Sequence, residues 1–305
     1  MLLPIEKTIA NLSDRRKPLL NSKLVDLSNL TPAELGLFRK TWARVEVERR
    51  RQIIYRLVEL AEGNLELNFD SIFITCLKDE DAEVKSKAIE GLWENEEASL
   101  INPLTSLLTG DSSEKVQAAA ASALGKFAML AEFQKLRPGY TARIYRALLG
   151  VIGNKTRSVE IRRRALEAAA PLNLPSVKET IMEAYQSKEP KLRVSAIYAM
   201  GKNCDSSWLP TLLKELGSTD AEMRYEAAGA CGELEEKEAA PYLAGLTTDP
   251  DADVQKAAIQ ALGKIGGSEA RECLKQCLLH PDETVQQAAE QALNEFKGEE
   301  DLLSL

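Results

Sequence analysis

Apolar residues recur along this chain at a fixed spacing. In the segment 251–263, apolar or small residues stand at Val254 and four, seven and eight positions after it, which places them on one face of an α-helix. We call the first residue of each such set the anchor and the helix that carries it the anchor helix. The pattern predicts helices that each bury one narrow, alanine-rich stripe. The anchors are Leu20, Ile53, Val84, Val116, Ile161, Leu192, Met223, Val254 and Val285.

The spacing of the anchors is nearly constant. The four intervals from Ile161 to Val285 are each 31 residues long, and the earlier intervals are 33, 31, 32 and 45 residues. A period of this length is typical of repeat proteins, in which each unit buries its apolar face against its neighbours. A second apolar segment precedes each anchor helix, as in 208–216, 239–246 and 270–278. The chain is therefore predicted to be all-α and built from two-helix units.

Polar residues and glycines stand at fixed distances from the anchors. A carboxylate three residues before an anchor can accept hydrogen bonds from the free N–H groups of the first helical turn. A glycine nine residues after an anchor is interpreted as the point where the helix thins or ends. A capping box with proline at the first helical position, 31–34, predicts one further helix start. The carboxylates are Asp81, Glu189, Asp220, Asp251 and Asp282, and the glycines are Gly125, Gly201, Gly232 and Gly263.

These residues resemble the HEAT-repeat family, and in particular the short bacterial repeats of phycobilin-lyase subunits, with the signature D-x-x-V-R-x-x-A-x-x-A-L-G. The signature stands at Asp251, Val254, Ala258 and 261–263, and the resemblance extends over at least 52–296. It implies a right-handed α-solenoid of about eight or nine two-helix repeats, with the anchor helices along its concave side. It also implies a ladder between the capping carboxylates and the basic residues that follow four anchors, Lys85, Arg162, Arg193 and Arg224.

We expect a single α-solenoid domain over residues 1–305. Within it, 1–30 is a weak N-terminal capping repeat, 31–125 and 140–297 hold the repeats, and 298–305 is an acidic tail. The one interval of 45 residues contains an insertion at 126–139. This insertion is either a longer helix or loop, or a binding surface that projects from the array.

Charge is distributed unevenly. The chain has a net charge of −8, yet 134–166 holds nine basic residues against one acid, whereas 215–305 holds twenty acids against seven bases. A local positive field can steer an acidic or phosphate-bearing partner, although a solvated helix face explains the same residues. The candidate anion-binding residues are Arg137, Arg143, Arg146, Arg162 and Arg164.

Helix geometry also selects residues for a partner protein. Positions two and six after each anchor lie opposite the buried stripe. Tyr198 and Tyr225 fall at these positions on adjacent repeats, close to Arg163, and tyrosine and arginine are enriched in binding hot spots. The candidate partner-binding residues are Tyr55, Arg163, Glu167, Tyr198 and Tyr225.

The sequence contains no recognisable catalytic constellation. Its one histidine, His280, is interpreted as a turn residue, and a zinc site made with Cys273 and Cys277 is disfavoured because His280 falls past the helix end. No nucleotide-binding or nucleophile-elbow motif occurs, so we expect no catalytic residue, cofactor or metal. Trp42, Trp93 and Trp208 are predicted to be core wedges. Five cysteines without a C-x-x-C pair, and no apolar run long enough for a membrane, predict a cytoplasmic protein with free thiols.

Three functions are compatible with these patterns. The first is a non-enzymatic scaffold that binds a protein partner on the concave face. The second is binding of nucleic acid or another polyanion through 134–166. The net charge of −8 argues against nucleic acid as the ligand. The third, suggested by the family resemblance, is an accessory protein similar to a bilin lyase or isomerase. The sequence favours the first.

Overall fold

The computed structural model describes residues 4–14 and 16–303, and within these ranges every regular element is a helix. The chain divides into two compact units. Unit 1 comprises 1–130 and 136–147, and unit 2 comprises 131–135 and 148–305. The prediction of an all-α, HEAT-type stack of helix pairs is confirmed, and each unit is described by itself below.

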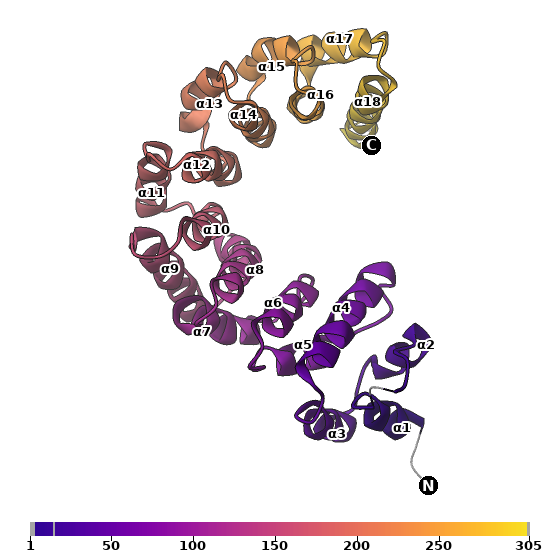
Figure 1. Cartoon of the computed structure of the whole chain (residues 1–305). Coiled ribbons are helices and arrows are strands. Elements are labelled where there is room, and N and C mark those ends of the chain that lie inside the picture. The colour runs from indigo at the N-terminus through magenta and orange to yellow at the C-terminus, as the bar shows by residue number, and fades with distance from the viewer. Residues whose placement is uncertain (1–3, 15, 304–305) are drawn as a thin grey trace. The chain divides into compact units, whose positions relative to one another are not determined.

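Unit 1 contains the N-terminal helices, coloured indigo to magenta in Figure 1. Two of its anchor helices, α4 and α6, pack against each other. The predicted capping box at the start of α3 is present, because the Thr31 hydroxyl accepts from the Glu34 N–H and the Glu34 carboxylate accepts from the Thr31 N–H. The helices are α1 (Pro4–Asn11), α2 (Asn21–Leu24), α3 (Pro32–Trp42), α4 (Val47–Gly63), α5 (Asp70–Cys76), α6 (Ala82–Gly91), α7 (Ile101–Gly110) and α8 (Glu114–Glu132).

Unit 2 is the more regular of the two. Its anchor helices pack each against the next, on the inner side of the curve that this unit forms in Figure 1, and its remaining helices alternate with them on the outer side. The boundary between the units falls within α8 and within α9 (Pro138–Gly153). The anchor helices are α10 (Val159–Ala169), α12 (Pro190–Asn203), α14 (Ala221–Leu234), α16 (Ala252–Ile265) and α18 (Glu283–Leu303), and the outer ones are α11 (Pro175–Tyr185), α13 (Leu209–Glu215), α15 (Ala240–Leu246) and α17 (Gly267–Cys277).

The anchors form the core, with one exception. Every anchor from Ile53 to Val285 is at most 4% exposed. Leu20 is 51% exposed, so the assignment of an anchor to this position was wrong. The neighbouring Leu24 and Leu27 are buried instead, because they face the interior from α2 and the short turn that follows it.

The glycines nine residues after the anchors do not end their helices. Gly201, Gly232 and Gly263 lie inside α12, α14 and α16. A methyl group added at Gly201 would lie 2.7 Å from the Cα of Ala230 on the next anchor helix, and one at Gly232 would lie 2.9 Å from the Cα of Ala261. The interpretation of these glycines as helix ends was therefore wrong, because their absent side chains allow successive anchor helices to approach backbone to backbone.

The charged ladder differs from the one that the resemblance implied. Arg224 pairs with Asp249 through two contacts, Nε to Oδ2 at 2.7 Å and Nη2 to Oδ1 at 2.8 Å, and Lys85 pairs with Asp111. Asp111 and Asp249 stand five residues before the next anchor rather than three. The side chains of the capping aspartates Asp81 and Asp251 accept from N–H groups of the first turns of α6 and α16, and Asp81 also accepts from Arg51 of α4 at 3.1 and 2.7 Å.

Other predicted residues divide into confirmed and corrected ones. Trp42 and Trp208 are buried as predicted, but Trp93 is 59% exposed and is no core wedge. His280 is a turn residue, with its Nδ1 accepting from the Asp282 N–H at 3.1 Å. Residues 126–132 of the insertion continue α8. No helix in the described residues is long and apolar enough to span a membrane.

Candidate functional site

The structure brings Tyr198 and Tyr225 together. They come from α12 and α14, are 37% and 44% exposed, and line one groove of about 190 Å³ on the anchor-helix face of unit 2. The groove continues along Tyr225 into a second hollow at the start of α14 and α16. We call the first hollow the tyrosine groove. Its lining also includes small residues that keep it open, Gly229, Ala230, Ala257 and Ala261.

One side of the tyrosine groove carries a linked group of three charges. Lys202 and Lys264, from α12 and α16, both contact Glu233 of α14, at 2.9 Å to Oε2 and 2.6 Å to Oε1. Lys202 also lies 5.9 Å from the centre of the Tyr198 ring, within range of a cation–π interaction. These contacts tie three successive anchor helices together and hold the Tyr198 ring in place.

All four charged residues that line the groove were missed by sequence reasoning, and Glu226 is the one of them without an ion pair to a described residue. It lies beside Tyr225, is half-buried, and has no ion-pair partner among the described residues. Burial, together with the nearby charges of Glu167 and Glu222, raises the pKa of Glu226 to about 7. A signal was present in the sequence, because Glu226 stands three residues after its anchor, where the flanking anchor helices carry Ser195 and Ala257.

Arg163 and Glu167 lie next to this groove but take part in a closed network. Arg163 donates from Nη1 to Glu160 at 2.9 Å and from Nε to the Ser195 hydroxyl at 3.1 Å, and Ser195 donates to Glu167 at 2.6 Å. Arg164 contacts Glu160 and Glu167, each at 3.0 Å. The guanidinium groups of Arg163 and Arg164 are therefore engaged by carboxylates of their own helix and do not line the tyrosine groove.

The remaining basic candidates belong to different places. Arg162 donates to the backbone oxygen of Ile152 at 2.9 Å within unit 2. Arg137, Arg143 and Arg146 lie in unit 1, are exposed, and have no ion-pair partner among the described residues. Arg137 directly precedes α9, and Arg143 and Arg146 lie within it.

Tyr55 lies on α4 in unit 1 and is held by charged neighbours. Its hydroxyl donates to Glu83, which also contacts Lys115, and Lys87 lies 5.1 Å from the centre of its ring. The hydrogen bond to Glu83, followed by burial, raises the pKa of Tyr55 to about 12. Tyr55 is thus part of a separate exposed cluster, away from the residues of the tyrosine groove along the chain.

The two neighbouring cysteines of α17 share a cavity. Cys273, Cys277 and His280 line a hollow of about 510 Å³ between α15 and α17. The Cys273 thiol and the Thr247 hydroxyl stabilise the thiolate of Cys277 and lower its pKa to about 7. Among the described residues, no three His, Cys, Asp or Glu side chains are arranged to hold a metal ion.

Comparisons with known proteins agree with the fold. A family model of HEAT repeats matches residues 71–149 and 209–294. The CpcE–CpcF complex of phycocyanin lyase from Nostoc sp. PCC7120 is similar in structure, with a TM-score of 0.55, 14% sequence identity, and coverage of 94% of this chain and 97% of that chain. YibA of E. coli is similar with a TM-score of 0.50, 17% identity, and coverage of 93% and 99%. At these identities the likeness concerns the fold alone. No curated protein sequence matches the chain.

Proposed function

Because the chain belongs to the HEAT-repeat family, we propose that it is a non-enzymatic scaffold that binds a protein partner in the tyrosine groove of unit 2. The observation that carries this proposal is the convergence of Tyr198 and Tyr225, which come from different helices, on one hollow. Exposed aromatic rings beside a hollow are the anchors that dominate many protein interfaces. The neighbouring repeats supply an extended surface around them.

The charges of the groove favour a partner that brings a basic side chain. Lys202 and Lys264 are already engaged by Glu233, whereas Glu226 makes no ion pair with a described residue. The nearby Arg163 acts on Glu226 only through its charge, because its guanidinium contacts Glu160 and Ser195. A half-buried carboxylate gains more from an incoming lysine or arginine than an exposed one does, because solvent screens it less. The proposed partner segment therefore combines an apolar contact with the two rings and a basic residue directed at Glu226.

An affinity-capture experiment tests this proposal. The tagged protein is expressed in cells of its source organism, and captured proteins are compared between the wild type and the Tyr198→Ala/Tyr225→Ala variant. We expect the variant to lose its partner, since removal of two interface anchors costs about 2 kcal/mol or more, roughly thirtyfold in affinity. The Tyr242→Ala variant is the matched control, because Tyr242 is 54% exposed on the outer helix α15.

The outcome is informative in both directions. A partner kept by Tyr242→Ala and lost by the groove variant, with unchanged circular dichroism of both proteins, supports the proposal. Identical sets of captured proteins from all three chains would remove the tyrosine groove from the function of the molecule. Gln260 also lines the groove, so a photo-crosslinking amino acid can be placed at this position. A crosslink from it to the captured partner would locate the contact directly.

A further inference from the structure

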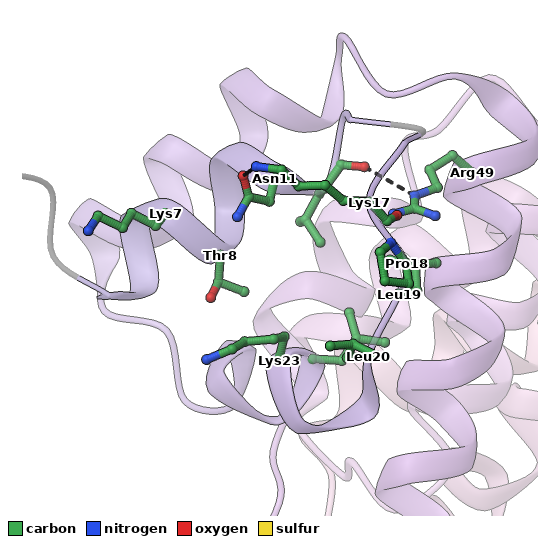
Figure 2. Close-up of a pocket in the computed structure, with 11 residues that line it drawn as sticks. Lys7, Thr8, Asn11, Lys17, Pro18, Leu19, Leu20, Lys23 and Arg49 are labelled. Carbon is green, nitrogen blue, oxygen red and sulfur yellow. Dashed lines mark hydrogen bonds between the residues drawn. The ribbon is translucent and has the colours of Figure 1, made fainter.

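A further cavity, of about 430 Å³, lies at the N-terminal end of unit 1 (Figure 2). It opens between α1, α2 and the segment that joins them. Its walls are apolar, and the buried Leu12 and Leu24 form part of them together with Leu20, which is 51% exposed. A hollow of this size with a largely apolar lining is within the range of ligand-binding sites.

The polar lining of this N-terminal pocket is basic. Lys7, Lys17, Lys23 and Arg49 all line it, and no described residue that lines it is acidic. Arg49 donates to the backbone oxygens of Leu12 at 3.3 Å and Lys17 at 2.8 Å, which fixes the segment between α1 and α2. Figure 2 shows the Lys7 and Lys23 side chains extending to the same side of the pocket.

The cations of the pocket are only partly neutralised. The Lys23 ammonium lies 3.7 Å from Asp26, and both side chains are exposed, so this contact is weak. Lys17 donates to the amide oxygen of Asn11, a neutral group, and the charge of Asp14, which does not line the pocket, acts on Lys17 and Arg49. Lys7 has no partner among the described residues. The pocket therefore presents apolar walls and a positive mouth, which fits a segment that has acidic residues next to leucines.

The chain itself contains such a segment. Residues 299–305 read EEDLLSL, with three consecutive acids followed by three leucines within four positions. We propose that this tail segment of a second copy of the chain binds in the N-terminal pocket. The acids meet the lysines at the mouth, and the leucines cover the apolar wall at Leu20. Charge complementarity and the matching order of acidic and apolar groups carry the assignment.

This contact joins two different surfaces of the chain, so it is heterologous. Each copy offers both a pocket and a tail segment, and a contact of this type links copies head to tail. Association costs translational and rotational freedom, and exposed ion pairs contribute little each. We expect a dissociation constant on the order of 10–100 μM. Added salt should weaken binding and raise this constant, because it screens the ion pairs.

Fluorescence anisotropy with a labelled peptide of residues 294–305 tests the proposal on the full chain. We expect the peptide to bind the wild type and a scrambled peptide of the same composition to fail. The Leu20→Glu variant should weaken binding about tenfold or more, because it places an acid at the apolar wall against an acidic ligand. Val25→Glu is the matched control, since Val25 is an exposed apolar residue that follows α2 but does not line the pocket.

A charge exchange tests the orientation. A chain with Lys7→Glu and Lys23→Glu should lose the wild-type peptide and regain binding to a peptide with Glu299→Lys and Glu300→Lys. Sedimentation velocity of the full chain should show an average mass that rises with concentration, and Leu20→Glu should abolish the rise while Val25→Glu keeps it. Failure of the peptide to bind, equal binding by Leu20→Glu, or a chain that stays monomeric well above the dissociation constant of the peptide would each overturn the proposal.

Discussion

Helices approach one another differently in the two units. In unit 2, Gly201, Gly232 and Gly263 each face an alanine of the next anchor helix, and the added methyl group would come within 2.7–2.9 Å of it. In unit 1, Gly91 of α6 stands seven rather than nine residues after its anchor, and it faces the ring of Phe73 from α5, also at 2.7 Å. Glycines of the anchor helices therefore allow close approach to the next anchor helix in unit 2, and make room for a large aromatic ring of the paired helix in unit 1.

This difference explains why unit 2 is regular and carries the groove. Alanine and glycine leave little freedom in the distance between neighbouring anchor helices, so each repeat is placed like the one before it. Side chains at equivalent positions, such as Tyr198 of one repeat and Gly229 of the next, then fall on one surface. In unit 1 the aromatic ring fills the space at the glycine, and the charged network of Asp79 with Trp42 and Arg50 supports the adjoining turn.

The largest expected effect comes from filling the close approach in unit 2. Gly201→Leu places a side chain against the backbone of Ala230, and overpacking of this kind costs about 3 kcal/mol of unfolding free energy. Gly229→Leu is the control, since Gly229 is also inside an anchor helix but has no atom within 4 Å of an added methyl group. It should stabilise by about 0.5–1 kcal/mol through helix propensity. Urea unfolding followed by circular dichroism measures both, and equal stability of the two variants would contradict the packing argument.

A smaller effect is expected at the turn between repeats. Arg224→Gln leaves Asp249 buried without its cation, which should cost about 2 kcal/mol. Gln at this position can still hydrogen-bond a backbone oxygen of the turn, as Gln255 does one repeat later at 2.6 Å. The double variant Arg224→Gln/Asp249→Asn should recover about half of the loss, because the buried charge is gone. A double-mutant cycle of unfolding free energies measures the coupling, and strictly additive losses would show that the pair is unimportant.

The fold could be predicted from the sequence because the repeat pattern recurs eight times with a buried anchor, from Ile53 to Val285. Each repeat gives independent evidence for the same two-helix unit, so a wrong anchor at one position, as at Leu20, leaves the prediction of the fold unchanged. The role of Gly201 was misread because a glycine late in a helix pattern is typical both of a helix end and of a close approach. Only the distance between Gly201 and Ala230, which lies 29 residues later in the sequence, distinguishes a helix end from a close helix approach. The repeat period does not give this distance.

The candidate site was predicted in part. Tyr198 and Tyr225 follow from helix geometry, because both stand opposite the buried stripe. The engagement of Arg163 by Glu160 and Ser195 could not be predicted, since it depends on side-chain orientation and on a contact between two helices. Tyr55 shows the same limit of a helical-wheel argument, as it shares the exposed face of its own helix but lies in a different unit.

The smallest expected effect is pH-dependent and concerns one position of the anchor helices. Three residues after the anchor, α4 and α6 of unit 1 and α10 of unit 2 carry the basic residues Arg56, Lys87 and Arg164, whereas α14 carries Glu226. Burial in unit 2, with Glu167 and Glu222 nearby and Arg163 opposing them, raises the pKa of Glu226 from 4.5 to about 7. The folded chain therefore holds this proton more tightly than the unfolded chain, and stability falls as the pH rises from about 4.5 through 7.

Glu226→Gln removes the charge that causes this loss. We expect the variant to match the wild type near pH 4.5 and to be more stable by about 1–2 kcal/mol at pH 8, which is less than the full shift would give because solvent screens a part-buried group. Unfolding in urea at pH 4.5, 6 and 8 measures the difference, with Glu272→Gln, an exposed carboxylate of α17, as the control. If Glu226 also binds a basic side chain of a partner, the Glu226→Gln variant should gain stability and lose that partner. The carboxylate would then contribute to binding at a cost in stability. A stability difference that stays constant between pH 4.5 and 8 would contradict the raised pKa and, with it, the picture of Glu226 as an unpaired charge within an otherwise regular array.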